Sequence, residues 1–241
     1  MNAKPVVLAL IAALPLAGCG STSHETTKPR RATPTAFDAS RFVRTVDNPW
    51  FPLAPGSVYR YRGVKDGEPS TEVVRVTNRT HAILGVDATA VTDRLYEHGR
   101  LAEDTVDWYA QDRDGNVWYL GEATRELDRH GGTASTSGSW QAGVDGARAG
   151  IYMPAKPAVG QSFRQEYLKG EAEDHFEVAE RDVRVRVPYG SSDHALRTRE
   201  WTPLEPDVVD AKFYVRGVGT VLERTVKGAN ERNELVSFKR G

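Results

Sequence analysis

Four polar side chains between residues 171 and 177 are of types that bind cations. Glu171, Glu173, His175 and Glu177 occupy alternate positions, so in an extended strand they share one face. Carboxylate oxygens suit Ca²⁺ or Mg²⁺, and imidazole suits Zn²⁺. A closed coordination shell would need further ligands from a neighbouring strand. A solvated strand face explains the same residues, so a divalent metal and a metal-dependent hydrolase are kept as the alternative.

Aromatic side chains offer a second kind of chemistry, the binding of an apolar or amphiphilic ligand. Two Trp-Tyr pairs, at 108–109 and 118–119, consist of neighbours that point to opposite faces of a strand, so each pair directs one ring inward. Inward rings can line a pocket, whereas packing in the core and a sugar-binding surface are the alternatives. The residues predicted to line a pocket are Trp108, Trp118, Trp140 and Tyr152.

Sequence signals for catalysis and for nucleic-acid binding are absent. The chain contains no G-x-S-x-G, P-loop or H-E-x-x-H motif, and its one cysteine is Cys19. We therefore predict a non-catalytic protein without a cofactor. After residue 37 there are 28 basic and 32 acidic side chains, a net charge of −4. This balance gives no electrostatic footprint for nucleic acid.

The elements that must position these side chains have the pattern of β-strands. Residues 182–187 alternate three valines with charged side chains, which is the period of a half-buried strand. Gly-containing turn signals recur between such segments, as at 65–67, 98–99 and 227–228. We predict an all-β, mainly antiparallel meander that forms a barrel or half-open sandwich, with one short helix near residues 36–45. Other strands are predicted at 73–77, 105–111, 117–121, 211–215, 220–226 and 234–239.

Residues 133–160 form the longest stretch without a strand pattern. A loop of this length in a compact domain either serves a function or covers an open end of a sheet. We expect the second role here, over an edge or a barrel mouth.

The N-terminal segment is typical of an export signal. Lys4 precedes an apolar run, residues 5–16, that is too short to span a bilayer as a helix. The run ends in Leu16-Ala17-Gly18-Cys19, which resembles the lipobox of bacterial lipoproteins. This resemblance implies removal of residues 1–18 and attachment of lipid, including palmitate, to Cys19. Two or more acyl chains would anchor the protein stably to the membrane.

The remainder divides into a tether and one domain. Residues 19–37 are rich in Ser, Thr and Pro, so we predict a disordered tether. Residues 38–241 are predicted to form a single extracytoplasmic domain on the cell membrane. In a cell with two membranes, Gly20 in place of Asp after Cys19 is compatible with the outer membrane.

A second resemblance covers the chain from Asn48 to its C-terminus. The segments 48–53, 107–112, 200–204 and 216–221 are similar to a group of exported bacterial proteins of unassigned function. This second resemblance implies a β-rich extracytoplasmic domain and identifies no catalytic residues. The sequence thus predicts a lipid-anchored envelope module that holds an apolar or amphiphilic ligand, such as a lipid. A structural partner of another envelope protein is a further alternative.

Overall fold

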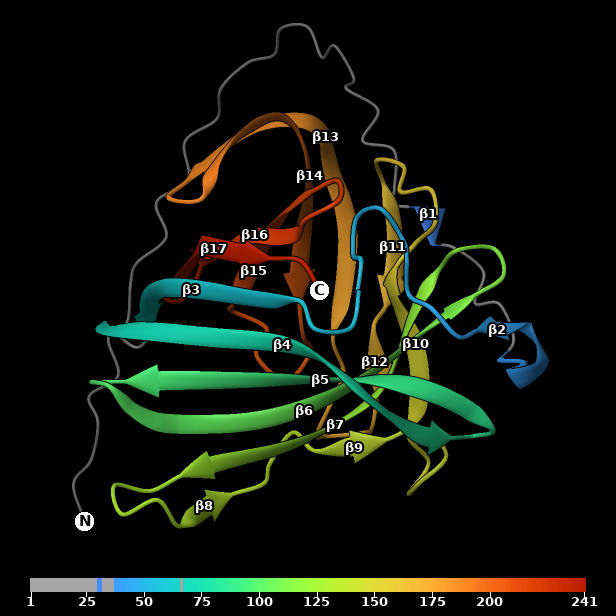
Figure 1. Ribbon diagram of the computed structural model, residues 1–241, viewed down its shortest axis with the longest axis horizontal. Helices are drawn as coiled ribbons and strands as arrows, with labels where there is room; N and C mark the ends of the chain where they lie inside the picture. The colour runs from blue at the N-terminus through green and yellow to red at the C-terminus, as the bar shows by residue number, and fades with distance from the viewer. Residues whose placement is uncertain (1–29, 32–36, 66) are drawn as a thin grey trace, which may run out of the picture.

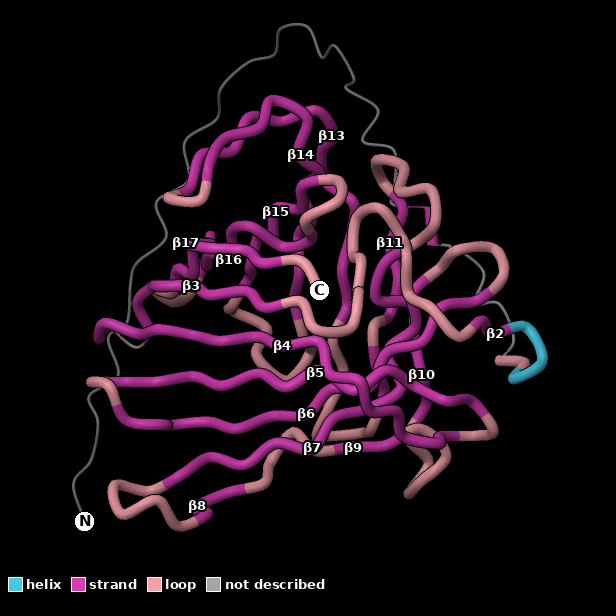
Figure 2. Tube along the Cα trace, in the orientation of Figure 1, coloured by secondary structure: helices cyan, strands magenta, loops and turns pink. Residues whose placement is uncertain are grey.

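The computed structural model describes residues 30–31, 37–65 and 67–241 (Figure 1). The signal segment, Cys19 and most of the predicted tether lie outside the described residues. Within the described residues the protein is built from strands, turns and one turn of 3-10 helix, which confirms the all-β prediction (Figure 2). No helix in this part of the chain is long and apolar enough to cross a membrane.

The seventeen strands of the described residues join in one continuous sheet. Their bounds are β1 Arg30–Arg31, β2 Phe42–Val43, β3 Val58–Lys65, β4 Glu68–Ile83, β5 Val86–Glu97, β6 Arg100–Asp112, β7 Val117–Leu127, β8 Thr133–Ser135, β9 Trp140–Gln141, β10 Arg148–Met153, β11 Gln161–Arg164, β12 Glu166–Tyr167, β13 His175–Val187, β14 Gly190–Trp201, β15 Val209–Val215, β16 Gly219–Lys227 and β17 Arg232–Lys239.

The sheet curls into a nearly closed barrel (Figure 1). Hairpins join β3 to β7 in sequence order, and a second meander runs from β13 to β17. The two meanders meet where β17 pairs with β3, with Leu235 opposite Tyr61. On the other side β13 pairs with β11, and the ring returns to β7 through β12 and β10. Apart from the parallel pair β1–β11, these pairings are antiparallel.

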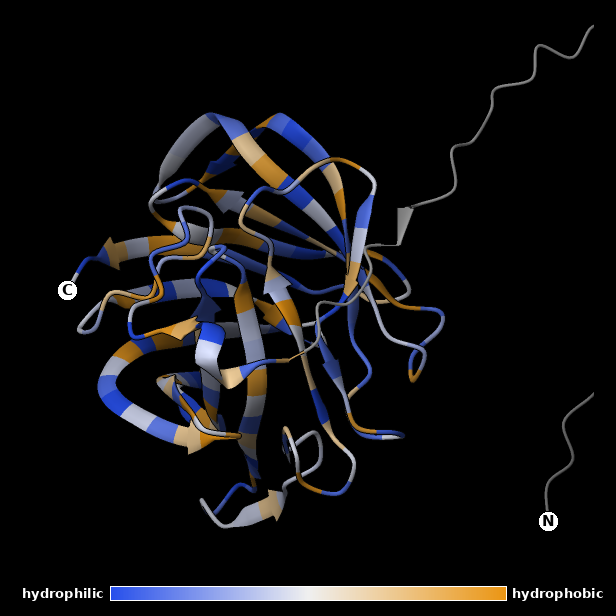
Figure 3. Cartoon of the chain, turned by 90° about the vertical axis from the view of Figure 1, so that its right-hand side faces the viewer, coloured by the Kyte–Doolittle hydropathy of each residue, from blue (hydrophilic) through white to orange (hydrophobic). Residues whose placement is uncertain are grey.

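Alternating side chains give the sheet an inside and an outside. Along the end of β13, Val185 and Val187 are buried and Val183 is half-buried, whereas Arg184 and Arg186 between them are exposed, as the sequence predicts. The same alternation of apolar and polar residues runs along most strands in Figure 3. Because successive side chains point to opposite faces, the inward rows of many strands combine into one core.

The predicted helix near residues 36–45 is present only as a single 3-10 turn, Ala39–Arg41. Asp38 caps it, since Oδ1 of its carboxylate accepts a hydrogen bond of 3.0 Å from the backbone N–H of Ser40. The helix is shorter than predicted because β2 follows at once and pairs with the end of β6. Pairing with the sheet satisfies the backbone groups that a longer helix would otherwise bond internally.

The stretch 133–160, predicted as a loop, contains three short strands, β8, β9 and β10. Of these, β10 closes the barrel, because it pairs with β7 on one side and with β12 on the other. Gly150 makes the approach feasible: a Cβ atom there would lie 2.2 Å from the carbonyl oxygen of Arg164. The segment therefore supplies part of the barrel wall, which its irregular sequence pattern does not indicate.

The segment before β3, residues 44–57, is tied to the barrel by Asn48, which is 2% exposed. Its Nδ2 donates to the carbonyl oxygens of Gly115 at 2.8 Å and Pro154 at 3.2 Å. Its backbone N–H donates to Oε1 of Gln111 at 2.8 Å. These bonds hold the following residues against the barrel interior, where Phe51 reaches the candidate site.

Candidate functional site

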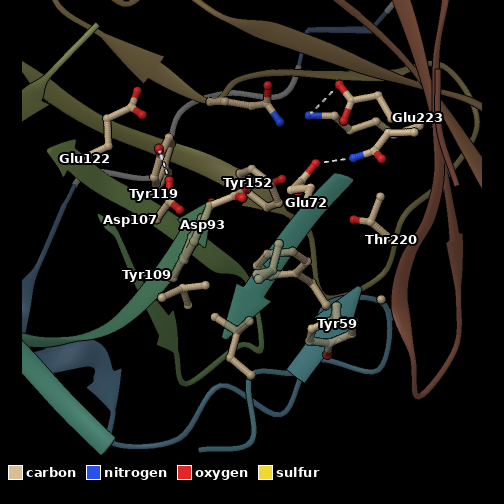
Figure 4. Close-up of a pocket in the computed structure, with 18 of the residues that line it drawn as sticks. Tyr59, Glu72, Asp93, Asp107, Tyr109, Tyr119, Glu122, Tyr152, Thr220 and Glu223 are labelled. Carbon is tan, nitrogen blue, oxygen red and sulfur yellow. Dashed lines mark hydrogen bonds and ion pairs between the residues drawn. The ribbon is translucent and has the colours of Figure 1, made fainter. Parts of the chain in front are cut away.

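A cavity of about 270 Å³ lies inside the barrel (Figure 4). This is close to the lower end of the size range of small-molecule sites, about 300–1,000 Å³. Strands from both meanders contribute to its wall. The lining residues are Phe51, Pro52, Leu53, Tyr59, Tyr61, Glu72, Val74, Val91, Asp93, Asp107, Tyr109, Tyr119, Glu122, Tyr152, Gln165, Glu166, Asp174, Lys212, Gly219, Thr220, Glu223 and Asn233.

Tyrosines make up most of the aromatic wall. Tyr109 and Tyr119, which pair across β6 and β7, stack with ring centroids 4.8 Å apart. Tyr152 on β10 packs edge-on against Tyr109 at 5.0 Å, and Phe51 lies 4.5 Å from Tyr152. Such offset and edge-on contacts stabilise a rigid wall beyond simple area burial. Tyr152 is therefore one predicted pocket residue that the structure places at the cavity.

Trp108 and Trp118 lie on the other face of their strands. The indole of Trp108 stacks on the ring of His81, with centroids 4.6 Å apart. The indole of Trp118 packs against Phe37 and Phe42, each at 5.8 Å, and its Nε1 donates to Asp112 at 3.0 Å. In each Trp-Tyr pair it is the tyrosine that lines the cavity.

Trp140 supports the cavity from behind its lining. Its Nε1 donates a 2.8 Å hydrogen bond to Oε2 of Glu166, a lining carboxyl. Its ring packs edge-on against Tyr119 at 5.3 Å. The four predicted pocket residues are thus divided, with Tyr152 at the cavity, Trp140 in contact with its lining, and Trp108 and Trp118 elsewhere.

Among the residues that the structure describes, seven carboxyl groups face the cavity, against one cation, Lys212. Burial raises the pKa of Asp107 to about 6, although a hydrogen bond from Tyr119 opposes the change. Burial, aided by the charge of Asp107, raises the pKa of Glu122 to about 8. Burial, aided by the charges of Asp174 and Glu122, raises the pKa of Glu166 to about 9. Some of these groups therefore hold protons at neutral pH.

Lys212 on β15 lies between two of the acidic groups. Its Nζ is 3.0 Å from Oε2 of Glu200 and 3.5 Å from Oε1 of Glu223. Burial alone lowers the pKa of the ammonium group, but the two carboxylates outweigh it and raise the pKa well above its ordinary value. Burial also raises the pKa of Glu223 to about 7, against the opposing charge of Lys212. Lys212 is thus paired with Glu200 and Glu223 and stays charged.

The predicted metal face is only partly a strand. β13 begins at His175, so Glu171 and Glu173 lie in the preceding turn, where Glu173 accepts a hydrogen bond from the backbone N–H of Gly170. His175 stacks on Trp201, with ring centroids 5.6 Å apart, and Glu177 follows it on the same half-buried face. In the described part of the chain, no group of three His, Cys, Asp or Glu side chains is arranged to hold a metal ion.

The cavity carboxyl groups were not predicted from the sequence as a site. One signal existed: Asp174 shares a strand face with Phe176 and Val178, and so interrupts an apolar pattern. In the structure Phe176 and Val178 are buried and Asp174 lines the cavity. The same applies to Asp107, which has the same parity as Tyr109 on β6. A charged residue on the otherwise apolar face of a predicted strand is therefore the sequence signal that could have identified these cavity residues.

Fold and site together define an all-β, nearly closed barrel with an internal cavity lined by tyrosines and carboxyl groups. Among crystal structures, the chain is similar to a Bacteroides fragilis protein described as exported and of YmcC-like fold. The identity is 15%, the TM-score is 0.46, and the match covers 79% of this chain and 99% of that one.

A Parabacteroides distasonis protein described as a lipoprotein is also similar, with 11% identity and a TM-score of 0.39 over 79% of this chain and 98% of that one. No family model and no curated protein matches the chain.

Proposed function

We propose that this protein is a lipid-anchored binding module of the cell envelope that holds a small amphiphilic ligand in the barrel interior. The cavity carries the proposal, because it combines an aromatic wall with polar groups that converge from both meanders. An apolar pocket with a few convergent polar groups is the usual form of a ligand site. A wholly apolar ligand would leave the carboxyl groups without partners, so the ligand has a polar part.

The anchor is proposed from the lipobox. Lipid on Cys19 and a tether of residues 20–37 would hold the domain close to the membrane on its extracytoplasmic side. The protein would act there by binding and perform no chemistry.

Association with another envelope protein is the second candidate function, and it would use an apolar surface. Large apolar side chains that are exposed come from seven different strands and turns: Leu84, Val144, Val159, Tyr189, Leu204, Val226 and Val236. The cavity, where an aromatic wall and polar groups meet, is the better candidate for the functional site.

Filling the cavity is expected to abolish ligand binding. Val74 lines it from β4 and is half-buried, so Val74→Trp would occupy the space with an indole. Native mass spectrometry of the full-length protein in nanodiscs, with organic extraction of the same sample, is expected to show a stoichiometric small molecule that the variant loses. Val159→Trp, at a position 61% exposed, is the control and should retain it. Equal retention by both variants would contradict a cavity site.

Replacing Cys19 with serine is expected to release the protein from the membrane fraction. The wild-type protein should incorporate labelled palmitate, and its intact mass should exceed that of residues 19–241 by the attached lipid. Serine lacks the thiol that receives the diacylglyceryl group, so the variant should incorporate none. Unchanged labelling of the Cys19→Ser variant would show that the anchor lies elsewhere.

A further inference from the structure

The carboxyl groups of the cavity form a row across neighbouring strands. Glu122 on β7 is the direct cross-strand partner of Asp107 on β6. Asp93 on β5 follows diagonally, since the partner of Asp107 is Val91, two residues away. Asp93 is hydrogen-bonded in turn to Glu72 on β4. Like charges on adjacent strands destabilise a sheet, so this row is not explained by folding.

Beyond β4 the row continues into the second meander. Glu72 accepts a hydrogen bond from Nδ2 of Asn233 on β17, and Asn233 pairs with Glu223 on β16. The strand between, β3, places Gly63 opposite Asn233, where any Cβ atom would lie 1.8 Å from the carbonyl oxygen of Arg232. Figure 4 shows Glu122 and Glu223 on opposite sides of the cavity, with Asp107, Asp93 and Glu72 between them.

A polar atom at the cavity has no partner among the described residues, and this observation is independent of the charges. Oδ1 of Asn233, a lining residue, is buried and accepts no hydrogen bond. Buried polar atoms are normally satisfied, so this oxygen indicates a ligand that donates a hydrogen bond.

We infer that the cavity binds an elongated aliphatic amine with two or more ammonium groups. The inference rests on the proposed function and names its ligand class. Ammonium groups supply both the N–H donor that the buried oxygen of Asn233 lacks and the positive charge that a row of carboxylates requires. The tyrosine faces accommodate the alkyl segments and add cation–π attraction. The cavity volume of about 270 Å³ is that of a site for a small ligand rather than for a long lipid chain.

The spacing of the row distinguishes an organic polycation from a metal ion. The carboxyl groups are distributed over five strands, and no three of the described His, Cys, Asp and Glu side chains converge to hold a metal. A linear diamine can instead contact carboxylates at separate points. Without a ligand the raised pKa values let these acids keep protons; an entering ammonium group favours the ionised form and expels them. Binding of an amine is therefore coupled to proton release.

Calorimetric titration of the full-length protein in zwitterionic nanodiscs tests the inference, with empty nanodiscs as the blank. Three linear probes of matched length are compared: 1,8-diaminooctane, 1,8-octanediol and octanoate. We expect the diamine to bind at least about tenfold more tightly than the other two, because charged hydrogen bonds and ion pairs form only with it. Repeating the titration in buffers of different ionisation enthalpy should show protons released.

Matched variants test whether the cavity carboxylates bind the diamine. Glu72→Gln combined with Asp93→Asn removes two carboxylates while keeping their shape, and should weaken diamine binding about tenfold or more. Glu180→Gln, at an exposed position of β13, should leave binding unchanged. Circular dichroism confirms that each variant is folded before titration.

The two proposals fail differently. If octanediol or octanoate binds as tightly as the diamine and Val74→Trp abolishes that binding, the cavity is a ligand site and the ammonium assignment is wrong. If the diamine does not bind, or binds without sensitivity to the double variant, the assignment is also overturned. The co-purification experiment then decides separately whether the cavity holds a ligand at all.

Discussion

Replacement of Lys212 by methionine is expected to lower the free energy of unfolding by about 4 kcal/mol at pH 8. Lys212 neutralises Glu200, which is 7% exposed, and Glu223. Removing one partner of a buried ion pair leaves an uncompensated charge and costs about 3–5 kcal/mol. Methionine keeps the volume of the lysine stem, so the effect reports charge rather than packing. Urea-induced unfolding, followed by tryptophan fluorescence, measures it.

Two variants separate this effect from a general sensitivity of the barrel. The double variant Lys212→Met/Glu200→Gln also removes the buried carboxylate charge that Lys212→Met leaves unpaired. Most of the lost free energy of unfolding should therefore return. Thr198, whose hydroxyl donates to Glu200 at 2.8 Å, can still donate to the glutamine oxygen. Lys227→Met breaks an exposed pair with Asp207 and should change stability by no more than about 0.5 kcal/mol. A Lys212→Met variant as stable as Lys227→Met would show that Lys212 does not neutralise buried charge.

The ligand-free protein is expected to lose stability as the pH rises from 5 to 9. Burial holds the pKa of Glu122 at about 8 and that of Glu166 at about 9, against an ordinary value of 4.5. The folded state therefore binds protons more tightly than the unfolded state. The stability gained is fully present below about pH 4.5 and is lost as the pH rises through 8 and 9. Each unit by which a pKa is raised contributes about 1.4 kcal/mol to this loss.

Thermal and urea unfolding at pH 5, 7 and 9 measure this slope. The double variant Glu122→Gln/Glu166→Gln cannot ionise at these positions, so it should be more stable than the wild type at pH 9 and have a flatter profile. The hydrogen bond from Nε1 of Trp140 survives at position 166, because the glutamine side-chain oxygen can accept it. Glu180→Gln should keep the wild-type slope. A wild-type protein whose stability is flat or rises over this range would refute the assignment of raised pKa values.

Both predictions follow from the same property, an excess of carboxyl groups over cations in the barrel interior. Natural proteins break local rules of stability mainly at functional sites. The row of carboxyl groups facing the cavity breaks the rule against adjacent like charges. Beside it, the buried Oδ1 of Asn233 lacks a hydrogen bond, which breaks a second rule. A bound cation would reduce the repulsion among these carboxylates. A diamine should therefore raise the midpoint of thermal unfolding most at high pH, where the acids are ionised.

The sequence alone predicted the class of fold and located seven of the seventeen strands of the described residues. Alternation of valines at 183, 185 and 187 predicted a half-buried strand, and Gly-containing turns predicted the hairpins, because both are local properties of the backbone. The lipobox before Cys19 is likewise a local motif. The resemblance to exported β-rich proteins also came from the sequence.

Only the tertiary structure decided which residues form the site. Alternation separates two faces of a strand but does not tell which face is the interior, so the tryptophans at 108 and 118 could not be distinguished from the tyrosines beside them. The closure of the barrel by β10 depends on pairing with β7 and β12, which are distant in sequence. From the sequence alone, isolated acidic residues such as Asp107 are not distinguished from solvated surface residues. Closure of the barrel places their side chains inside. The cavity exists because non-local pairing brings their separate strands together.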